Sequence, residues 1–378
     1  ITSPITTSGD TMTLWKQTCA ALAALTLAAC GQGGGGADTK TLRIYNWSDY
    51  IDPAILEAFT QETGIKVVYD TFDSNEILET KVLQGDTGYD IVTPSNHNVP
   101  RYIQAGAIQP LDRAKLSNWN NLWPDIMAHM EPFDPGAKYA LPYMWGTMGI
   151  GFNKAEVEKR LPGVALDSWA VVFEPANLAK LKDCGVYYLD AAEDMYAVAL
   201  HYQGKDPNSK VPADYAAATD MLVKARPYVR KFHSSEYIEG LANGDICVAI
   251  GYSGDVLQAK ARAEEAKNGV EIDYVIPREG SQVWFDVFTI PKDAPNAAAA
   301  HTFLNYMLRP QVIAAASNYT QYANANLAST MMVDAAVRDN PNVYPTPEVF
   351  KKLFVTTAKD QTLLREVTRQ WTRVQTGQ

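Results

Sequence analysis

Aromatic residues stand beside acids or hydroxyls at four points of the sequence. Such a pattern suits a flexible organic dication, because aromatic faces accept its methylene chain and its charge while carboxylates compensate each ammonium group. Removing an ion from water has an effective cost of several kcal/mol, which an opposite charge and good hydrogen bonds must offset. The segments are residues 47–50 (Trp-Ser-Asp-Tyr), 252–255 (Tyr-Ser-Gly-Asp), 284–286 (Trp-Phe-Asp) and 321–322 (Gln-Tyr).

A single aromatic residue at a strand end is more often part of a core or a domain interface than of a ligand wall. Whether the four segments form a ligand wall therefore depends on the strands and helices that position them. Residues 42–47 predict a strand, and Asp52 with Pro53 predicts the start of a helix that ends at Gly64. The next predicted elements are a strand at 65–72, a helix that Ser74 caps and Gly85 ends, and a strand at 89–93.

Three predicted strands thus end near Trp47, Asp73 and Ser95. In open α/β sheets, ligands bind at the carboxyl ends of parallel strands. We therefore expect these three positions to lie along one edge of a parallel sheet.

The second half of the sequence continues the alternation of apolar runs and amphipathic stretches, which is typical of an α/β protein. The pattern predicts helices at 213–226, 236–243, 254–266 and 297–308, and strands at 246–252, 273–276 and 283–290.

Length and charge narrow the class of protein. A chain of 378 residues with 47% hydrophobic and 20% charged residues indicates a globular protein of two or three domains. Lys and Arg number 33 and Asp and Glu 43, a formal net charge of −10. A nucleic acid or an anionic membrane surface would require a basic footprint, so neither is expected as the main partner.

Motifs of common enzymes are missing. The sequence has no phosphate-binding loop, and residues 149–154 lack the third glycine of a dinucleotide fingerprint. The segment around Ser253 differs from a nucleophile elbow in the place of its second glycine. The five histidines are scattered without the spacing of zinc ligands. We therefore expect ligand capture rather than catalysis, with no catalytic residue, cofactor or metal.

Residues 1–39 have the features of an export signal and a tether rather than of a folded domain. After Met12, the apolar run at 19–29 is too short to span a bilayer and has the length of a signal-peptide core. The run closes in Leu-Ala-Ala-Cys, which resembles a bacterial lipobox that is lipidated at Cys30, and a Gly-rich tether follows. An ordinary signal peptide with an incidental cysteine is the alternative.

Cys184 and Cys247 are the two cysteines that remain beyond Cys30 in the exported chain. In an oxidising compartment they are a candidate disulfide, and two buried free thiols are the alternative.

Several longer stretches resemble the periplasmic putrescine-binding proteins of bacterial polyamine ABC transporters, which belong to the extracellular solute-binding proteins. The resemblance covers the chain from about residue 42 to its C-terminus, and matches of this length do not arise by chance. The stretches are residues 45–51 (YNWSDYI), 62–76 (ETGIKVVYDTFDSNE), 142–153 (PYMWGTMGIGFN), 241–255 (LANGDICVAIGYSGD), 285–288 (FDVF) and 322–326 (YANAN).

The resemblance implies an α/β fold of the type II periplasmic-binding kind, with two α/β lobes that close on a ligand in the cleft between them. We expect residues 40–143 and 279–313 to form the first lobe, and residues 144–278 and 314–378 the second. The same resemblance pairs Cys184 with Cys247.

The resemblance also implies a set of ligand-binding residues. Asp255 and Asp286 are the expected ammonium-binding carboxylates, and Glu193 is expected to take an amine directly or through water. The full expected set is Trp47, Ser48, Tyr50, Ser95, Glu193, Tyr252, Asp255, Trp284, Asp286 and Tyr322.

The expected function is the capture of a polyamine, putrescine first, in the periplasm and its delivery to the permease subunits of an inner-membrane ABC transporter. We expect a monomer that is anchored to a membrane through Cys30. Binding of spermidine or another amine is the alternative within this fold, and a polyamine sensor for a membrane signalling partner is the alternative of another class.

Overall fold

The structure is a computed structural model that describes residues 40–377. The expected signal peptide, the tether and Cys30 lie outside the described residues. Within the described part of the chain, no helix combines the length and the apolar character needed to cross a membrane.

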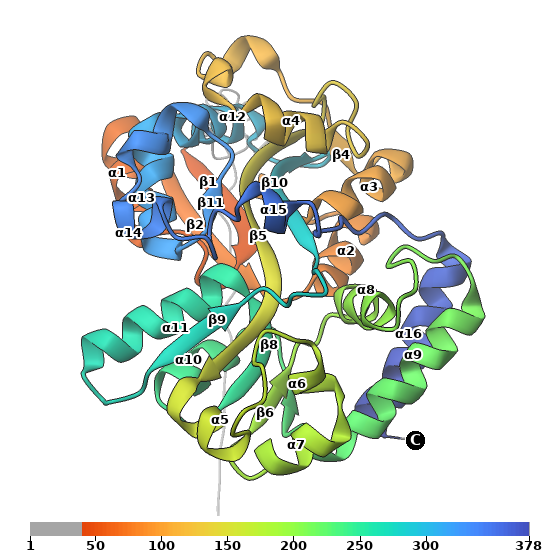
Figure 1. The fold of residues 1–378 in the computed structure, drawn as a ribbon. Coiled ribbons are helices and arrows are strands. Elements are labelled where there is room, and N and C mark those ends of the chain that lie inside the picture. The colour runs from red at the N-terminus through yellow and green to blue at the C-terminus, as the bar shows by residue number, and fades with distance from the viewer. Residues whose placement is uncertain (1–39, 378) are drawn as a thin grey trace, which may run out of the picture. The chain divides into compact units, whose positions relative to one another are not determined.

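One mixed β-sheet connects the strands of both halves of the described structure (Figure 1). Its central strand is β5 (Ala140–Asn153), which is buried along its full length. The first part of β5 pairs with β10 (Val283–Pro291), and its last part pairs with β8 (Val248–Tyr252) and β9 (Ile272–Val275). The sheet therefore has two ends that share one long strand.

We call the elements around one end of the sheet the first lobe. There β1 (Thr41–Trp47) lies between two parallel neighbours, and short β11 (Ala323–Asn324) pairs with β5. The neighbours of β1 are β2 (Lys66–Phe72) and β3 (Ile91–Val92). The helices of this lobe include α1 (Pro53–Thr63), α2 (Asn75–Gln84), α3 (Val99–Ala105), α4 (Pro124–Met130), α12 (Ala297–Met307), α13 (Pro310–Thr320) and α14 (Ala335–Arg338).

The predicted start and end of α1 are confirmed. The Asp52 side chain accepts a hydrogen bond from the backbone N–H of Ala54, which satisfies one of the free donors at the helix N-terminus. Gly64 ends the helix with a φ of 71°, which a residue without Cβ adopts without strain. Ser74 caps α2 in the same manner through the N–H of Ile77.

We call the elements around the other end of the sheet the second lobe. Its strands β6 (Val186–Tyr188), β7 (Lys231–Phe232) and β8 are parallel. Its helices include the longer α8 (Ala192–Tyr202), α9 (Pro212–Ala225), α11 (Ser253–Ala266) and α16 (Gln361–Thr376), and the short α10 (Tyr237–Ala242). The strands and helices predicted for this half of the sequence are confirmed to within about two residues at each end.

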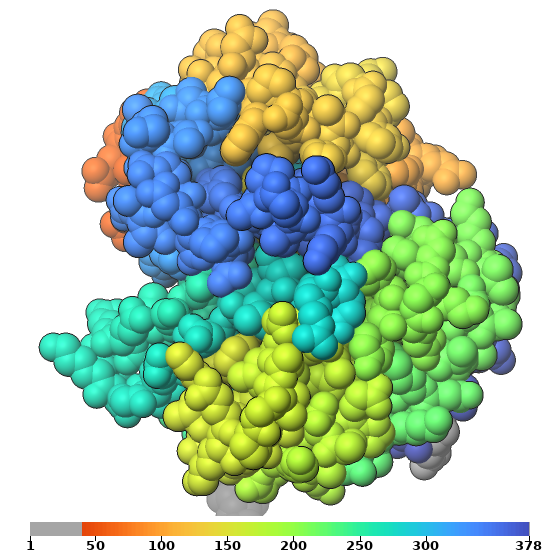
Figure 2. Space-filling model, viewed as in Figure 1, coloured from red at the N-terminus to blue at the C-terminus, as the bar shows by residue number. Residues whose placement is uncertain are grey.

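Several segments connect the lobes. Besides β5, the chain crosses between α15 (Pro347–Phe350) of the upper half of Figure 1 and α16 of the lower half. In this crossing segment, Phe354 forms a bridge with Gln282, just before β10. Figure 2 shows one face of the molecule, on which the blue C-terminal segments pack against the cyan and green segments.

Close packing at the crossing explains a glycine in β5. A Cβ atom at Gly149 would lie 2.3 Å from the carbonyl oxygen of Val275 on β9, so only glycine lets the two strands approach. On the far side of the second lobe, the disulfide between Cys184 and Cys247 is present, with Cα atoms 5.4 Å apart. This pairing confirms the prediction.

Candidate ligand-binding site

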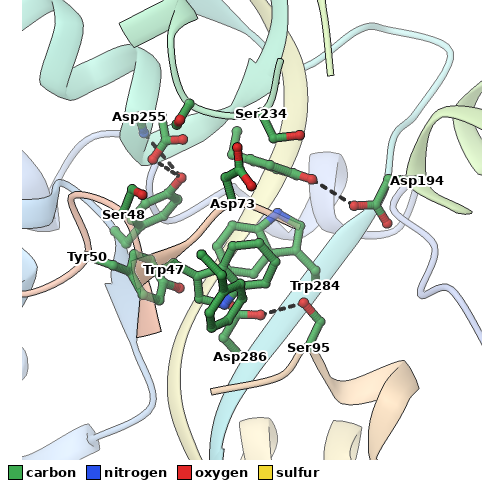
Figure 3. Close-up of a pocket in the computed structure, with 14 residues that line it drawn as sticks. Trp47, Ser48, Tyr50, Asp73, Ser95, Asp194, Ser234, Asp255, Trp284 and Asp286 are labelled. Atoms are coloured by element: carbon green, nitrogen blue, oxygen red, sulfur yellow. Dashed lines mark hydrogen bonds between the residues drawn. The ribbon is translucent and has the colours of Figure 1, made fainter. Parts of the chain in front are cut away.

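A pocket lies between the two lobes, with about 460 Å³ of space between the atoms, part of which is open to solvent. Nine of the ten residues that the sequence predicted for the site line this pocket, and Glu193 does not (Figure 3). The full lining consists of Trp47, Ser48, Tyr50, Phe72, Asp73, Ser95, Asp194, Ser234, Ser235, Tyr252, Asp255, Trp284, Asp286 and Tyr322.

The carboxyl ends of parallel strands supply one wall. β1 ends at Trp47, β2 ends at Phe72, and Ser95 follows β3 within three residues. Because these strands are parallel neighbours, their ends meet along one edge of the sheet, as the sequence predicted.

Asp286 lies on β10 and is 4% exposed. Its Oδ1 accepts a hydrogen bond of 2.7 Å from the Ser95 hydroxyl, and Ser95 in turn accepts one from the amide of Asn75 at 3.0 Å. Burial raises the pKa of Asp286 to about 8. The neutral hydroxyls of Ser95 and Tyr50 oppose this rise of the pKa only in part, so most of the charge of Asp286 stays uncompensated.

Asp255 lies in the first turn of α11, in the second lobe. Its two oxygens accept hydrogen bonds from the hydroxyls of Tyr237 at 2.6 Å and Tyr322 at 2.7 Å. Burial raises the pKa of Asp255 to about 6, although both phenol donors act in the opposite direction.

Asp194 is a third acid of the pocket and was missed in the sequence. Its oxygens accept hydrogen bonds of 2.8 Å from the Tyr252 hydroxyl and 2.8 Å from the side-chain amide of Gln282. The signal for Asp194 was its place beside Glu193 in the first turn of a helix, but the sequence does not say which of two neighbouring acids faces a cleft. Phe72 and Asp73 were also missed as ligand-binding residues, although they lie at a strand end that the sequence predicted. Ser234 and Ser235 follow β7, a two-residue strand that the sequence did not predict.

Glu193 turns away from the pocket. Both of its oxygens are already bound to cations, Oε1 to Nη2 of Arg101 and Oε2 to Nζ of Lys359, each at 3.1 Å. Burial alone would raise the pKa of Glu193, but Lys359 and Arg101 hold it below its usual value. The negative charge of Glu193 is therefore already compensated by two cations of the protein.

Aromatic rings fill the space between the acids. The Trp284 ring lies 5.2 Å from the Tyr322 ring and 5.7 Å from the Tyr252 ring, measured between centroids, and both contacts are T-shaped. Tyr50 makes a further T-shaped contact of 5.2 Å with Tyr322. Figure 3 shows Asp194, Asp255 and Asp286 at different edges around this aromatic group.

The charged residues that line the pocket are all acidic. Four aspartates line the pocket, and the lining contains no lysine or arginine. Within the described residues, no group of three or more His, Cys, Asp or Glu side chains is arranged to hold a metal ion. A cation that enters the pocket would thus meet carboxylates without displacing a cation of the protein.

Contacts across the cleft close the pocket. Arg262 of α11 forms an ion pair of 2.6 Å with Asp49 of the first lobe, and Gln258 donates a hydrogen bond of 3.3 Å to the Asp49 carbonyl. The His233 ring lies 3.7 Å from an oxygen of Asp73.

Comparison with known proteins agrees with this architecture. A family model described as bacterial extracellular solute-binding protein matches residues 54–346, which is more than half of the chain. The chain belongs to this solute-binding family.

Curated members of the solute-binding family are similar over nearly the full length. The chain is 51% identical to the putrescine-binding periplasmic protein PotF of Escherichia coli, covering 96% of this chain and 98% of that protein. It is 50% identical to the putrescine-binding periplasmic protein SpuD of Pseudomonas aeruginosa, covering 94% of this chain and 98% of that protein.

Solved structures of solute-binding proteins share the fold. A putative spermidine/putrescine ABC transporter protein of Listeria monocytogenes superposes with a TM-score of 0.81 at 33% identity, covering 90% of this chain and all of that chain. The expected α/β fold of two lobes with a cleft between them is thereby confirmed.

Proposed function

We propose that this protein captures a polyamine, putrescine first, in the periplasm and delivers it to the permease of an ABC transporter when its lobes close. The observation that carries the proposal is the pocket itself, which is lined by aromatic rings and four aspartates and by no basic residue. A dication between aromatic faces supplies the positive charge that such a lining lacks.

A diamine fits the placement of the acids. Asp286 lies on β10 and Asp255 on α11, on opposite sides of the aromatic group, and each receives hydrogen bonds from neutral donors. One ammonium group at each carboxylate leaves the methylene chain against the rings of Trp284 and Tyr322. The names of the two curated relatives, both putrescine-binding periplasmic proteins, support this choice.

Two alternatives share the capture step. Spermidine or another amine is the alternative ligand, since solved and curated relatives include proteins named for spermidine and putrescine together. A polyamine sensor for a membrane signalling partner is the alternative role. Loss of putrescine uptake in a deletion strain supports transport, and unchanged uptake supports sensing.

The proposal also covers the location of the protein, its oligomeric state, its lipid anchor and its lobe boundaries. We infer a periplasmic, non-catalytic protein, because its relatives are named as putrescine-binding periplasmic proteins, and a lipid anchor at Cys30 from the lipobox of the sequence. We also propose that the protein is a monomer. The lobe boundaries stay a prediction. Pairing of β11 with the first part of β5 and the bridge between Leu122 and Asn326 favour placing residues 314–346 with the first lobe, although α13 packs on α11 of the second lobe as well as on α1 and α12. The last helix, α16, packs on α8 and α9 of the second lobe.

Calorimetric titration of the mature protein tests the proposal. Putrescine, spermidine and agmatine are titrated beside neutral molecules of similar length, and the amines alone are expected to release or absorb heat. Small-angle scattering should show a decrease of the radius of gyration when putrescine is added. Absence of binding by every polyamine would refute the proposed function.

A further inference from the structure

Two glycines stand in the turn that leads to Asp255, in the sequence Gly-Tyr-Ser-Gly-Asp at 251–255. Gly251 lies in β8, and Gly254 lies in the first turn of α11. Neither glycine has a positive φ angle, so the backbone at both positions would accept a residue with a side chain. The reason for glycine must therefore lie in the surroundings.

A tyrosine ring packs directly against each of the two glycines. A Cβ atom at Gly251 would lie 2.6 Å from Cε2 of Tyr237, and a Cβ atom at Gly254 would lie 2.4 Å from Cδ2 of Tyr322. Both tyrosines are buried, with at most 2% of their surface exposed. In a close-packed interior, a side chain at either glycine would therefore displace a ring.

The same two tyrosines hold the carboxylate of Asp255. The Tyr237 hydroxyl donates a hydrogen bond of 2.6 Å to Oδ2, and the Tyr322 hydroxyl donates one of 2.7 Å to Oδ1. Each hydroxyl also accepts a backbone N–H of the turn, Tyr237 from Tyr252 at 3.0 Å and Tyr322 from Asp255 at 3.2 Å. Because a phenol oxygen carries a single hydrogen, these accepted bonds leave both phenol hydrogens for the carboxylate.

Each oxygen of Asp255 is thus held by a tyrosine that rests on a glycine of the same turn. Burial raises the pKa of Asp255, and the two phenol donors oppose this rise. We propose that the two glycines are positioning residues, which leave room for the two rings and so hold the Asp255 carboxylate in place for a ligand ammonium group. This inference rests on the proposed polyamine function, because that function assigns a ligand amine to Asp255.

The remaining titratable neighbours of Asp255 do not touch the glycines. Asp49 raises the pKa of Asp255 and Arg262 lowers it. The charge of Asp255 also acts on Asp286 and Tyr50 of the pocket. None of these four residues provides one of the three atoms nearest to a Cβ at either glycine. A methyl group added at a glycine should therefore act on Asp255 through the tyrosines.

Gly251→Ala is the sharpest test, because neither Gly251 nor Tyr237 lines the ligand pocket. The added methyl group displaces the Tyr237 ring and weakens one of the two hydrogen bonds to Asp255, so the pKa of Asp255 should rise from about 6. Calorimetry of putrescine binding between about pH 5.5 and about pH 8.5 should show the lower inflection of the affinity about one pH unit higher. Such a shift corresponds to binding that is about fivefold weaker at about pH 6.

Tyr237→Phe removes the hydroxyl and leaves the ring over Gly251. This variant should show the same upward shift, and Gly251→Ala added to it should shift the inflection no further. A further shift in the double variant would mean that the glycine acts on Asp255 without Tyr237, and the proposal would be wrong. Gly185→Ala controls for a general loss of stability, because Gly185 has a φ of 99° and its Cβ would meet Arg230 on the far side of the second lobe. Its affinity and its inflection should not change.

The folding of the variants is part of the test. If Gly251→Ala does not fold, Gly251→Ala with Tyr237→Leu gives the methyl group more room and should fold. A double variant that also fails to fold would show that Gly251 is needed for another reason and would overturn its role. At the other glycine, Gly254→Ala should raise the inflection, and it should raise it no further when Tyr322→Phe is already present.

The outcomes also separate this inference from the proposed function. An unchanged protein that binds no polyamine refutes the proposed function. A protein that binds putrescine, with the same inflection in Gly251→Ala as in the unchanged protein, refutes the role of the glycines alone.

Discussion

Two buried acids of the molecule, Asp286 in the ligand pocket and Glu193 on α8, are compensated in opposite ways. Asp286 is 4% exposed and Glu193 is 5% exposed, so burial does not distinguish them. Asp286 receives a hydrogen bond from the neutral Ser95 hydroxyl, whereas Glu193 binds two cations. Their pKa values accordingly move in opposite directions, upward for Asp286 and downward for Glu193.

The difference shows how one protein can use the same chemical group for binding and for stability. A buried carboxylate with only neutral donors has a raised pKa and becomes stably ionised when a cationic ligand supplies the missing positive charge. A carboxylate with internal cations is complete without a ligand, and removing it leaves its partners buried and uncompensated. Replacing the acid by its amide should therefore lower the ligand affinity at Asp286 and the free energy of unfolding at Glu193.

The largest expected effect is a loss of ligand affinity in Asp286→Asn. The amide has nearly the shape of the acid but cannot neutralise a buried ammonium group, so we expect the dissociation constant for putrescine to rise more than about a hundredfold, by about 3 kcal/mol or more. Calorimetry measures the affinity, and urea unfolding without ligand checks that the fold is intact.

Asp220→Asn is the matched control for this change, because the Asp220 side chain is 67% exposed and lies outside the pocket. The Asp220→Asn variant should bind putrescine with the affinity of the unchanged protein. An Asp286→Asn variant that binds putrescine normally would remove Asp286 from the site.

The opposite pattern is expected for Glu193→Gln. Arg101 and Lys359 then stay buried beside a neutral amide, so the free energy of unfolding should fall by about 3 kcal/mol. The putrescine affinity should fall by less than about tenfold, since no ligand oxygen is lost and only a nearby negative charge is removed. Unfolding is measured without ligand, because bound ligand adds its own stabilisation.

The double substitution Glu193→Gln with Lys359→Met sharpens this comparison. Replacing both members of a buried ion pair by neutral residues removes the uncompensated charge, so part of the lost stability should return. If Glu193→Gln instead abolishes putrescine binding at unchanged stability, Glu193 is a ligand residue and the contrast between the two regions is wrong.

The pH dependence of binding offers a test of intermediate size. Burial raises the pKa of Asp286 to about 8 and that of Asp255 to about 6, and a cationic ligand binds the ionised forms. The affinity is therefore highest above about pH 8 and falls as the pH falls, by up to about tenfold per pH unit for each group that has to lose a proton. Glu193 contributes nothing in this range, because Lys359 and Arg101 keep its pKa low.

Calorimetry between about pH 5.5 and about pH 8.5 measures this dependence, and buffers of different ionisation enthalpy report the protons released. In Asp286→Asn the upper part of the curve should become flat. An affinity for putrescine that does not change over the whole range would contradict the assignment of both aspartates.

Much of the first lobe and of the pocket could be predicted from the sequence, because the signals are local. Asp52 and Gly64 cap α1 through their own side-chain and backbone chemistry, and Trp47 and Ser95 follow strands whose parallel order places them at one edge. The orientation of α8 is not a local property. Consecutive helix residues point about 100° apart, so Glu193 and Asp194 face different surroundings, and the packing of the helix decides which one enters the pocket.

The partners of Glu193 were also beyond the reach of sequence patterns. Lys359 is 166 residues away along the chain and Arg101 is 92 residues away, and both arrive only when the crossing segment and α3 pack against α8. The strand β5 was missed as an element for a related reason. It is buried on all sides at the crossing, so its residues lack the alternation of apolar and polar side chains by which a half-buried strand is recognised.

The smallest expected effect comes from Tyr252→Phe, which tests whether Asp194 belongs with the acids of the pocket. The hydroxyl of Tyr252 donates one of the two hydrogen bonds to Asp194, and the ring contact with Trp284 does not depend on it. Gln282 retains the second hydrogen bond, so putrescine affinity should fall by about 1 kcal/mol, roughly fivefold. Tyr319→Phe, at a tyrosine that is 44% exposed, serves as the control. A fall as large as that of Asp286→Asn would show that the Tyr252 hydroxyl contacts the ligand itself, whereas no change in affinity together with lower stability would place Asp194 with Glu193 among the structural acids.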